Sequence, residues 1–142
     1  MIILDTTVLA YAVGSDHPIH SSCRQLLEAH ADGRIEAATT VEVVQEFAHV
    51  HARRRTRADA VSLAREYATA LEILVTSPAD LHRGLHLFEQ HPELGAFDAV
   101  LAAVALEHGA QALVSADRAF AVVLGLHWVD PAGSDLLKFV GA

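Results

Sequence analysis

The sequence predicts an α/β domain in which a mostly parallel sheet of four to five strands is covered by helices on both faces. Short apolar runs alternate along the chain with segments of helical pattern, and no long linker, repeat or low-complexity stretch interrupts them. The composition is 52% hydrophobic but only 6% aromatic, which is typical of the aliphatic interior of layered α/β folds. Strands separated by helices require crossover connections, which place the helices on the faces of a parallel sheet. At 142 residues, the chain is expected to form one domain over residues 1–142.

The strands are expected where short apolar runs end in a turn or a helix cap. The first run, Ile2 to Leu4, contains no polar residue, which is typical of a strand buried on both faces at the centre of a parallel sheet. The other predicted strands follow the same logic and cover residues 35–38, 71–76, 112–115 and, as the optional fifth, 126–129.

Helices are expected between these strands, and several begin or end at residues with a known capping role. Thr39 and Thr40 supply a cap after the second strand, and Ser77 caps a helix whose first turn contains Pro78. Gly109 ends the alanine-rich helix before the fourth strand. The predicted helices begin near Thr7 and just past Thr56, and others cover residues 21–30, 41–51, 78–91 and 97–108.

Charge and cysteine content narrow the functional classes. The formal net charge of −8 argues against indiscriminate binding to nucleic acid, because that affinity depends on cations that contact phosphates. The single cysteine, Cys23, excludes an intramolecular disulfide and fits a reducing compartment. Neither a signal peptide nor a run long enough to cross a bilayer is recognisable, so a cytoplasmic protein without a membrane partner is expected.

A local basic cluster stands out against the acidic background. Four of the ten lysine and arginine residues are Arg53, Arg54, Arg55 and Arg57, and no acidic residue lies among them. Two interpretations carry equal weight: contact with RNA phosphates, or a solvated helix end at which cations interact favourably with the helix dipole.

Four carboxylates occupy positions where the carboxyl ends of parallel strands meet, which is where ligands bind in open α/β sheets. Asp5 follows the first strand directly, and Asp117 follows the fourth strand in a similar pattern. Asp98 lies in the first turn of the alanine-rich helix, and Glu46 lies about two turns into the helix after the second strand. Asp5 could instead cap a helix, and Asp98 could simply stabilise a helix dipole.

Carboxylates that converge in this way need a cation or raised pKa values, because two of them about 4 Å apart repel by roughly 4 kcal/mol at an effective dielectric constant near 20. Mg²⁺ or Mn²⁺ suits oxygen ligands in a site without cysteine. A zinc site is less favoured, because His82 and His86 lack the HExxH pattern and are expected on a solvated helix face.

Four blocks of the sequence resemble the PIN-domain ribonucleases and, among them, the toxins of VapBC toxin–antitoxin pairs. In order, the blocks are Ile3–Val8, Thr40–Phe47, Phe97–Ala105 and Leu113–Phe120. The resemblance implies a three-layer α/β/α PIN-like fold and an acidic quartet around Mg²⁺, with two polar helpers. The quartet would be Asp5, Glu46, Asp98 and Asp117, and the helpers Thr6 and Ser115. Thr7 stands where the family commonly has serine, and Glu42 leaves open which glutamate of that helix faces the site.

The resemblance implies a metal-dependent endoribonuclease that acts as the toxin of a toxin–antitoxin system. Asp5, Asp98 and Glu46 would bind the metal directly or through water, and Asp117 would bind a second ion or orient the attacking water. A small domain with one basic cluster suits structured RNA, such as tRNA or rRNA. The resemblance also implies a homodimer and a cognate antitoxin whose arginine-bearing tail enters the acidic pocket.

Two further questions remain open at this point. Leu81, Leu85 and Phe88 could pack against another subunit, although burial in the core is the favoured interpretation. The protein could also be a non-catalytic RNA- or protein-binding module of the same fold. A binding module has no evident reason to keep four mutually repelling acids together, so the position of the quartet is the feature that discriminates.

Overall fold

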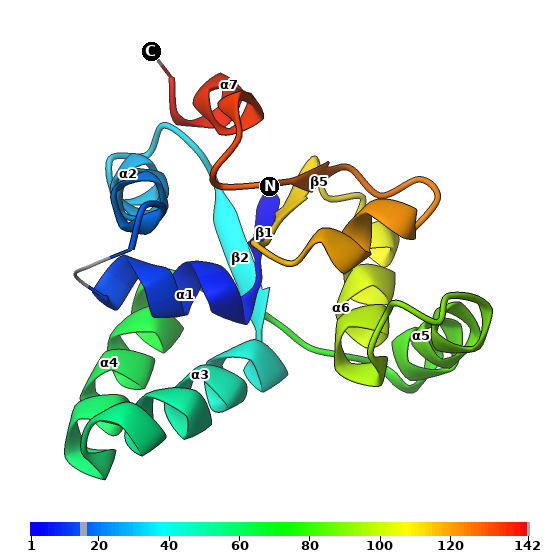
Figure 1. Cartoon of the computed structure of the whole chain (residues 1–142), viewed down its shortest axis with the longest axis horizontal. Coiled ribbons are helices and arrows are strands. Elements are labelled where there is room, and N and C mark those ends of the chain that lie inside the picture. Colours follow the sequence, from blue (N-terminus) through cyan, green and yellow to red (C-terminus); the bar gives the residue numbers. More distant parts are fainter. Residues whose placement is uncertain (15–16, 142) are drawn as a thin grey trace.

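In the computed structural model, which describes residues 1–14 and 17–141, five parallel strands form one sheet (Figure 1). Their order across the sheet is β3-β2-β1-β4-β5, and every neighbouring pair is parallel. The strands are β1 (Ile2–Leu4), β2 (Ala37–Thr40), β3 (Glu72–Leu74), β4 (Ala112–Val114) and β5 (Trp128–Val129). The predicted α/β class is therefore confirmed, and the optional fifth strand is present.

Helices cover both faces of the sheet, which gives the predicted three layers (Figure 1). On one side lie α1 (Thr6–Val13) and α2 (His20–Ala31), with α3 (Val41–Arg54) and α4 (Arg57–Ala70) beside them. On the other side lie α5 (Pro78–Gln90) and α6 (Ala96–Glu107). Two 3₁₀ helices and a final short helix complete the chain: η1 (Arg118–Val122), η2 (Ser134–Leu136) and α7 (Leu137–Val140). Within the described residues, no helix is both long and apolar enough to span a membrane.

The second strand covers Ala37–Thr40 and not the predicted residues 35–38, so it lies two residues later in the sequence. Its last two residues are the threonines that were expected only to cap the next helix. The Thr39 hydroxyl is fully buried and donates to the Leu4 carbonyl at 2.8 Å. Thr40 ends the strand and also caps α3, since its Oγ1 accepts from the Val43 amide at 3.2 Å. A β-branched residue whose hydroxyl finds a partner fits a buried strand, so polarity alone misplaced this boundary.

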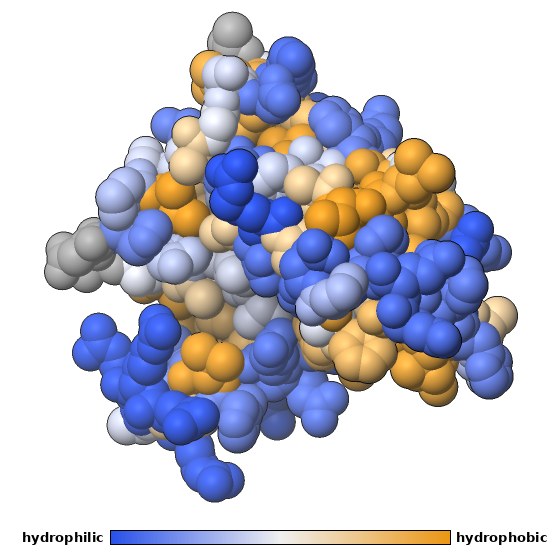
Figure 2. Space-filling model, turned by 45° about the vertical axis from the view of Figure 1, so that its right-hand side comes forward, coloured by the Kyte–Doolittle hydropathy of each residue, from blue (hydrophilic) through white to orange (hydrophobic). Residues whose placement is uncertain are grey.

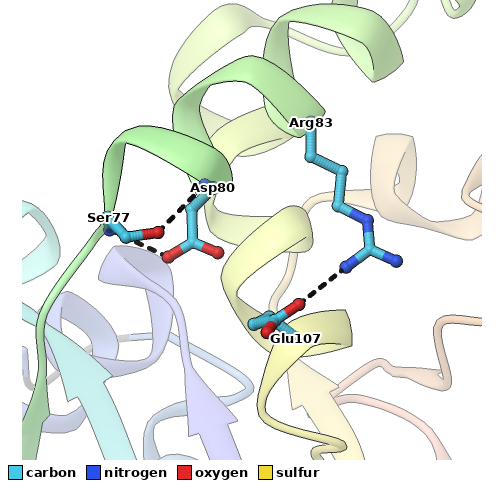
Figure 3. Close-up of polar contacts among 4 residues, drawn as sticks. All are labelled: Ser77, Asp80, Arg83 and Glu107. Atoms are coloured by element: carbon cyan, nitrogen blue, oxygen red, sulfur yellow. Dashed lines mark hydrogen bonds and ion pairs between the residues drawn. The ribbon is translucent and has the colours of Figure 1, made fainter.

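The predicted cap at the start of α5 is confirmed as a complete capping box (Figure 3). Ser77 Oγ accepts from the Asp80 amide at 3.1 Å, and Asp80 accepts in return from the Ser77 amide at 2.9 Å. An Arg83–Glu107 ion pair of 3.1 Å joins α5 to α6. Gly84 allows these helices to pack closely, because a Cβ atom there would lie 2.6 Å from Val100 Cα.

The expectation that Leu81, Leu85 and Phe88 are core residues is wrong. Their exposed fractions are 45%, 44% and 45%. Gly84 and Asp80 are the buried residues of α5, so a different face of the helix contacts α6. Figure 2, which turns the α5–α6 side forward, shows hydrophobic side chains gathered on that side of the molecule. The three residues form an exposed apolar stripe on α5.

Candidate active site

The four predicted acids come together in one pocket of about 280 Å³ at the carboxyl edge of the sheet. This edge is where β1 leads into α1, beside the start of α3 (Figure 1). The pocket, called the acid pocket below, is lined by Asp5, Thr6, Thr7, Ala10, Tyr11, Glu46, Val50, Arg54, Asp98 and Asp117. Four separate segments of the chain thus supply one carboxylate each.

Asp5 is the most firmly held of the four. Asp5 is only 3% exposed and occupies the N-cap position of α1, as the helix-cap interpretation predicts, but its side chain makes no capping hydrogen bond to that helix. Instead, Asp5 Oδ2 accepts from Ser115 Oγ at 2.6 Å and from Thr7 Oγ1 at 3.3 Å. The carboxylate therefore points across the strand ends, from β1 toward the residue that follows β4.

Ser115 connects Asp5 to Asp117. Its Oγ donates to Asp5 and accepts from the Asp117 amide at 2.9 Å, which fixes the backbone that carries the second aspartate. Thr7 Oγ1 accepts from the neighbouring Ala116 amide at 3.0 Å. Asp117 itself is exposed, and its Oδ1 accepts from the Ala119 amide at 2.9 Å at the start of η1. The predicted helper Ser115, and Thr7, which was not predicted as one, each contact the Asp5 carboxylate and a backbone amide.

The structure also separates the two glutamates of α3. Glu46 lies in the acid pocket, where its Oε2 accepts from Thr6 Oγ1 at 2.6 Å. Glu42, one turn earlier, accepts from the Thr76 hydroxyl and lines a neighbouring slot between α3 and α6 instead. Glu46 is therefore the glutamate that joins the other acids.

Burial and mutual repulsion disfavour the charged forms in this pocket. Burial raises the pKa of Asp5, although the hydrogen bond from Ser115 counteracts part of this rise. Asp98 is half-buried, and burial together with the charges of Asp5 and Asp117 raises its pKa to about 7. Asp98 and Asp117 also share a hydrogen bond, which raises the pKa of Asp98 further. A divalent cation would relieve this repulsion.

The donor set suits a hard cation, although its members are not yet gathered around one point. In the described part of the chain, no three histidine, cysteine, aspartate or glutamate side chains form a group that could hold a metal ion as they stand. Hydroxyl groups donate to one oxygen each of Asp5 and Glu46, which leaves the other oxygen of each carboxylate for a ligand. Carboxylate ligands without sulfur or imidazole favour Mg²⁺ or Mn²⁺ over zinc. His82 and His86 are exposed on α5, as expected for a solvated face.

The predicted arginine cluster divides between different surfaces. All four arginines are exposed, and Figure 2 shows strongly hydrophilic side chains at the far end of the α3–α4 pair. Only Arg54 lines the acid pocket, since it lies two turns after Glu46 on the same face of α3. Arg57 lines a separate groove along α4, and Arg53 and Arg55 line neither.

Sequence reasoning missed several residues of the acid pocket, of which Tyr11 is the largest. Its ring lies 4.0 Å from that of His17, measured between centroids. Tyr11 follows Thr7 by one helical turn, just as Val50 follows Glu46. Helical spacing could have found both, from the predicted Glu46 for Val50 and from Thr7, which lies in the first block of the resemblance, for Tyr11.

Comparison with known proteins finds relatives that match most of the chain. The sequence matches the PIN domain family over residues 2–125. It is 50% identical to Ribonuclease VapC7 of Mycobacterium tuberculosis over 99% of both chains, and 32% identical to Ribonuclease VapC23 of the same species over 85% of this chain and 96% of that one.

Solved structures agree in fold at lower identity. The toxin VapC20 of Mycobacterium tuberculosis, described as cleaving the sarcin–ricin loop, superposes with a TM-score of 0.71 at 19% identity, over 89% of this chain and 98% of that one. VapBC2 of Rickettsia felis, bound to a DNA fragment from its promoter, gives a TM-score of 0.73 at 20% identity, over 92% of this chain and 98% of that one. At these identities the solved structures show the fold alone.

Proposed function

Since this chain belongs to the PIN-domain family and, within it, to the VapC ribonucleases, it is an endoribonuclease toxin, and we propose that it cuts RNA at the acid pocket with Mg²⁺, for which Mn²⁺ can substitute. The observation that carries this proposal is the meeting of four carboxylates from four chain segments in one pocket, where the pKa of Asp98 is raised to about 7. Such costly grouping of acids is expected where a cation must be held.

The residues divide the work of hydrolysis, in which water attacks phosphorus and the bond to the leaving oxygen breaks. Asp5, Glu46 and Asp98 are assigned to the metal, directly or through water. When bound, the metal would lower the pKa of a coordinated water and neutralise charge that develops on the phosphoryl group. Ser115 and Thr6 orient the carboxylates that they contact. Asp117, at the exposed side, meets either a second ion or the attacking water.

The first experiment measures cleavage of total cellular RNA by the purified protein with Mg²⁺, Mn²⁺ or a chelator. A double variant, Asp5→Asn/Asp98→Asn, keeps the side-chain shapes and removes two charges. Metal-dependent cleavage that disappears in this variant supports the proposal. If both proteins bind RNA equally and neither cuts after any copurifying inhibitor is removed, the non-catalytic binding module is the better description.

Arg54 is proposed to contact an RNA phosphate beside the cut, because it is the one arginine of the predicted cluster that lines the acid pocket. Arg54→Gln should weaken RNA binding about tenfold at low salt, since each lost phosphate contact lowers affinity. Arg53→Gln, which removes the charge of another exposed arginine that lines neither the acid pocket nor the groove along α4, is the matched control. Equal affinities of the two variants, measured by fluorescence anisotropy, would contradict this role.

We further propose that a cognate antitoxin binds this chain and blocks the acid pocket with an arginine. A guanidinium group matches carboxylates in charge and geometry, so it would compete with the metal. The proposed location is the cytoplasm, where RNA is present and the buried free Cys23 stays reduced. Peptides with and without arginine, added to the cleavage assay, test the proposed block of the acid pocket. Equal inhibition by both peptides would contradict a role for the arginine.

A homodimer is proposed through the exposed apolar stripe of Leu81, Leu85 and Phe88 on α5. Water-exposed apolar residues grouped on one face are typical of a protein contact. Sedimentation should show a dimer that Leu85→Lys converts to a monomer. A wild-type monomer at micromolar concentration would contradict the proposal.

A further inference from the structure

A second pocket, the slot introduced above, is lined by residues of the same two helices that carry Glu46 and Asp98, and it has a different character. It measures about 270 Å³ and lies between the starts of α3 and α6. Glu42 lines it one turn before Glu46, and Phe97 lines it directly before Asp98. Each of the two helices therefore lines both pockets: α3 with Glu46 in the acid pocket and Glu42 in the slot, and α6 with Asp98 in the acid pocket and Phe97 in the slot. A strand of RNA whose phosphate reaches the acids would place an adjoining nucleotide at the slot.

The lining of the slot matches a nucleobase rather than a phosphate. Its walls are largely apolar and include Phe97, Val100 and Leu101, which suits the faces of a flat aromatic ring. Its charged group is the carboxylate of Glu42, which would repel a phosphate. The Thr76 hydroxyl donates to Glu42 Oε1 and so fixes the position of that carboxylate. A fixed acceptor in an apolar slot is complementary to the amino group of a base.

We propose that this slot binds the base of a nucleotide next to the cleaved bond and selects bases that carry an exocyclic amine, namely adenine, cytosine or guanine. Uracil has no such amine: its donor on that edge is the N3–H group, and the keto oxygens on both sides of it would lie close to the acceptor oxygens of Glu42 and weaken the contact. This inference rests on the ribonuclease function, because the base is brought to the slot by RNA that is cut in the acid pocket. Glu42 is thereby a residue that determines specificity, whereas Glu46 belongs to the metal site.

The test is the sequence of the ends produced when an RNA pool with a randomised segment is cleaved in Mg²⁺. The wild type should disfavour uracil about tenfold at one position beside the cut, which is the order that one good side-chain contact to a base provides. Glu42→Gln adds a donor of nearly the same shape, so discrimination against uracil should fall to about twofold at that position only. Glu72→Gln, the same change at an exposed residue of β3, should leave the pattern as in the wild type.

Other outcomes separate the two levels of the argument. A wild type that cuts no RNA overturns the proposed function and this inference with it. A wild type that cuts while Glu42→Gln leaves the base pattern unchanged, or slows all sites equally, overturns the slot alone. If Glu42→Gln fails to fold by circular dichroism, Thr76→Val replaces it, because loss of the fixing hydroxyl should also reduce discrimination. If Glu42→Gln changes the sedimentation coefficient of the protein but not the base pattern of cleavage, the slot contacts a second copy of the chain, and the proposal is overturned.

Discussion

Asp5 and Asp117 stand in the same local pattern, yet the structure treats them in opposite ways. Each follows a short buried strand, β1 or β4, and these strands are neighbours in the sheet. Asp5 is 3% exposed and accepts hydrogen bonds from two hydroxyl groups, whereas Asp117 is exposed and accepts at the start of η1. A repeated sequence pattern therefore predicted the neighbourhood of the two carboxylates but not their environments.

The difference follows from where each strand stops. Asp5 comes directly after the last residue of β1, at the middle of the sheet. Two residues, Ser115 and Ala116, separate Asp117 from the end of β4, and the first of them is fully buried. The residue directly after the strand is buried in both cases, but it is Asp5 after β1 and Ser115 after β4. Under the proposed function, the fixed aspartate would hold the metal, and the exposed aspartate would meet a second ion or the attacking water.

Asp5→Asn should cause the largest loss, about 10³-fold in the rate of RNA cleavage, because it removes a fixed charge that the metal requires. The fold should survive, since asparagine can still accept the hydrogen bond from Ser115. Single-turnover cleavage of a labelled RNA measures the effect. Asp59→Asn, an exposed aspartate at the start of α4, is the control and should cut like the wild type.

Asp117→Asn should reduce cleavage less, by about 10²-fold, because an exposed side chain that meets a second ion or a water is more easily replaced. Raising the Mg²⁺ concentration should recover part of the lost rate in this variant and not in Asp5→Asn. Equal losses in the two variants at every Mg²⁺ concentration would show that exposure does not distinguish their roles.

Ser115→Ala should slow cleavage about tenfold, as expected when a residue that orients a metal ligand is lost. Ser115 Oγ both donates to Asp5 and accepts from the Asp117 amide, so its loss affects both aspartates. Ser115→Thr keeps the hydroxyl and should cut faster than Ser115→Ala if the pocket admits the added methyl. Full activity of Ser115→Ala would contradict the proposed connection.

Much of the site was predictable because its residues follow directly from strand ends and helix starts. Asp5, Asp98 and Asp117 lie within a few residues of an element boundary, and such boundaries meet at the carboxyl edge of a parallel sheet. The choice between Glu42 and Glu46 was not predictable from periodicity, because residues four apart share a helix face. A hydroxyl from a distant segment, Thr76, decides it.

The errors in the fold have the same origin. The pattern of apolar and polar residues in α5 predicted an amphipathic helix but did not indicate which apolar residues face α6. Leu81, Leu85 and Phe88 are exposed. The close approach of the two helices at Gly84 selects the buried face, and this contact joins segments that are distant in the sequence. Local patterns set where elements lie, and contacts between elements set which faces are buried.

The smallest expected effect is a change in the stability of Asp98→Asn without metal, in addition to the loss of cleavage expected when a carboxylate assigned to the metal is removed. The pKa of Asp98 is about 7 in the folded protein against an ordinary value of 3.8, so folding takes up protons between these two values. The free energy of unfolding therefore falls as pH rises through this window and stays lower above it. Asparagine removes this penalty, and the variant in EDTA should melt about 3 °C above the wild type near pH 8, with the difference shrinking toward about pH 5.

Calorimetry across that pH range checks this prediction, and a melting difference that does not change with pH would contradict it. Because Asp5 and Asp117 both raise the pKa of Asp98, the same scan on Asp5→Asn and Asp117→Asn compares the two aspartates directly. The charge of Asp5 raises the pKa of Asp98 more than the charge of Asp117 does, but Asp117 also acts through a hydrogen bond, so either substitution should flatten the pH dependence. A variant whose stability keeps the pH dependence of the wild type would show that its carboxylate does not raise the pKa of Asp98, because the loss of a repelling charge must lower that pKa.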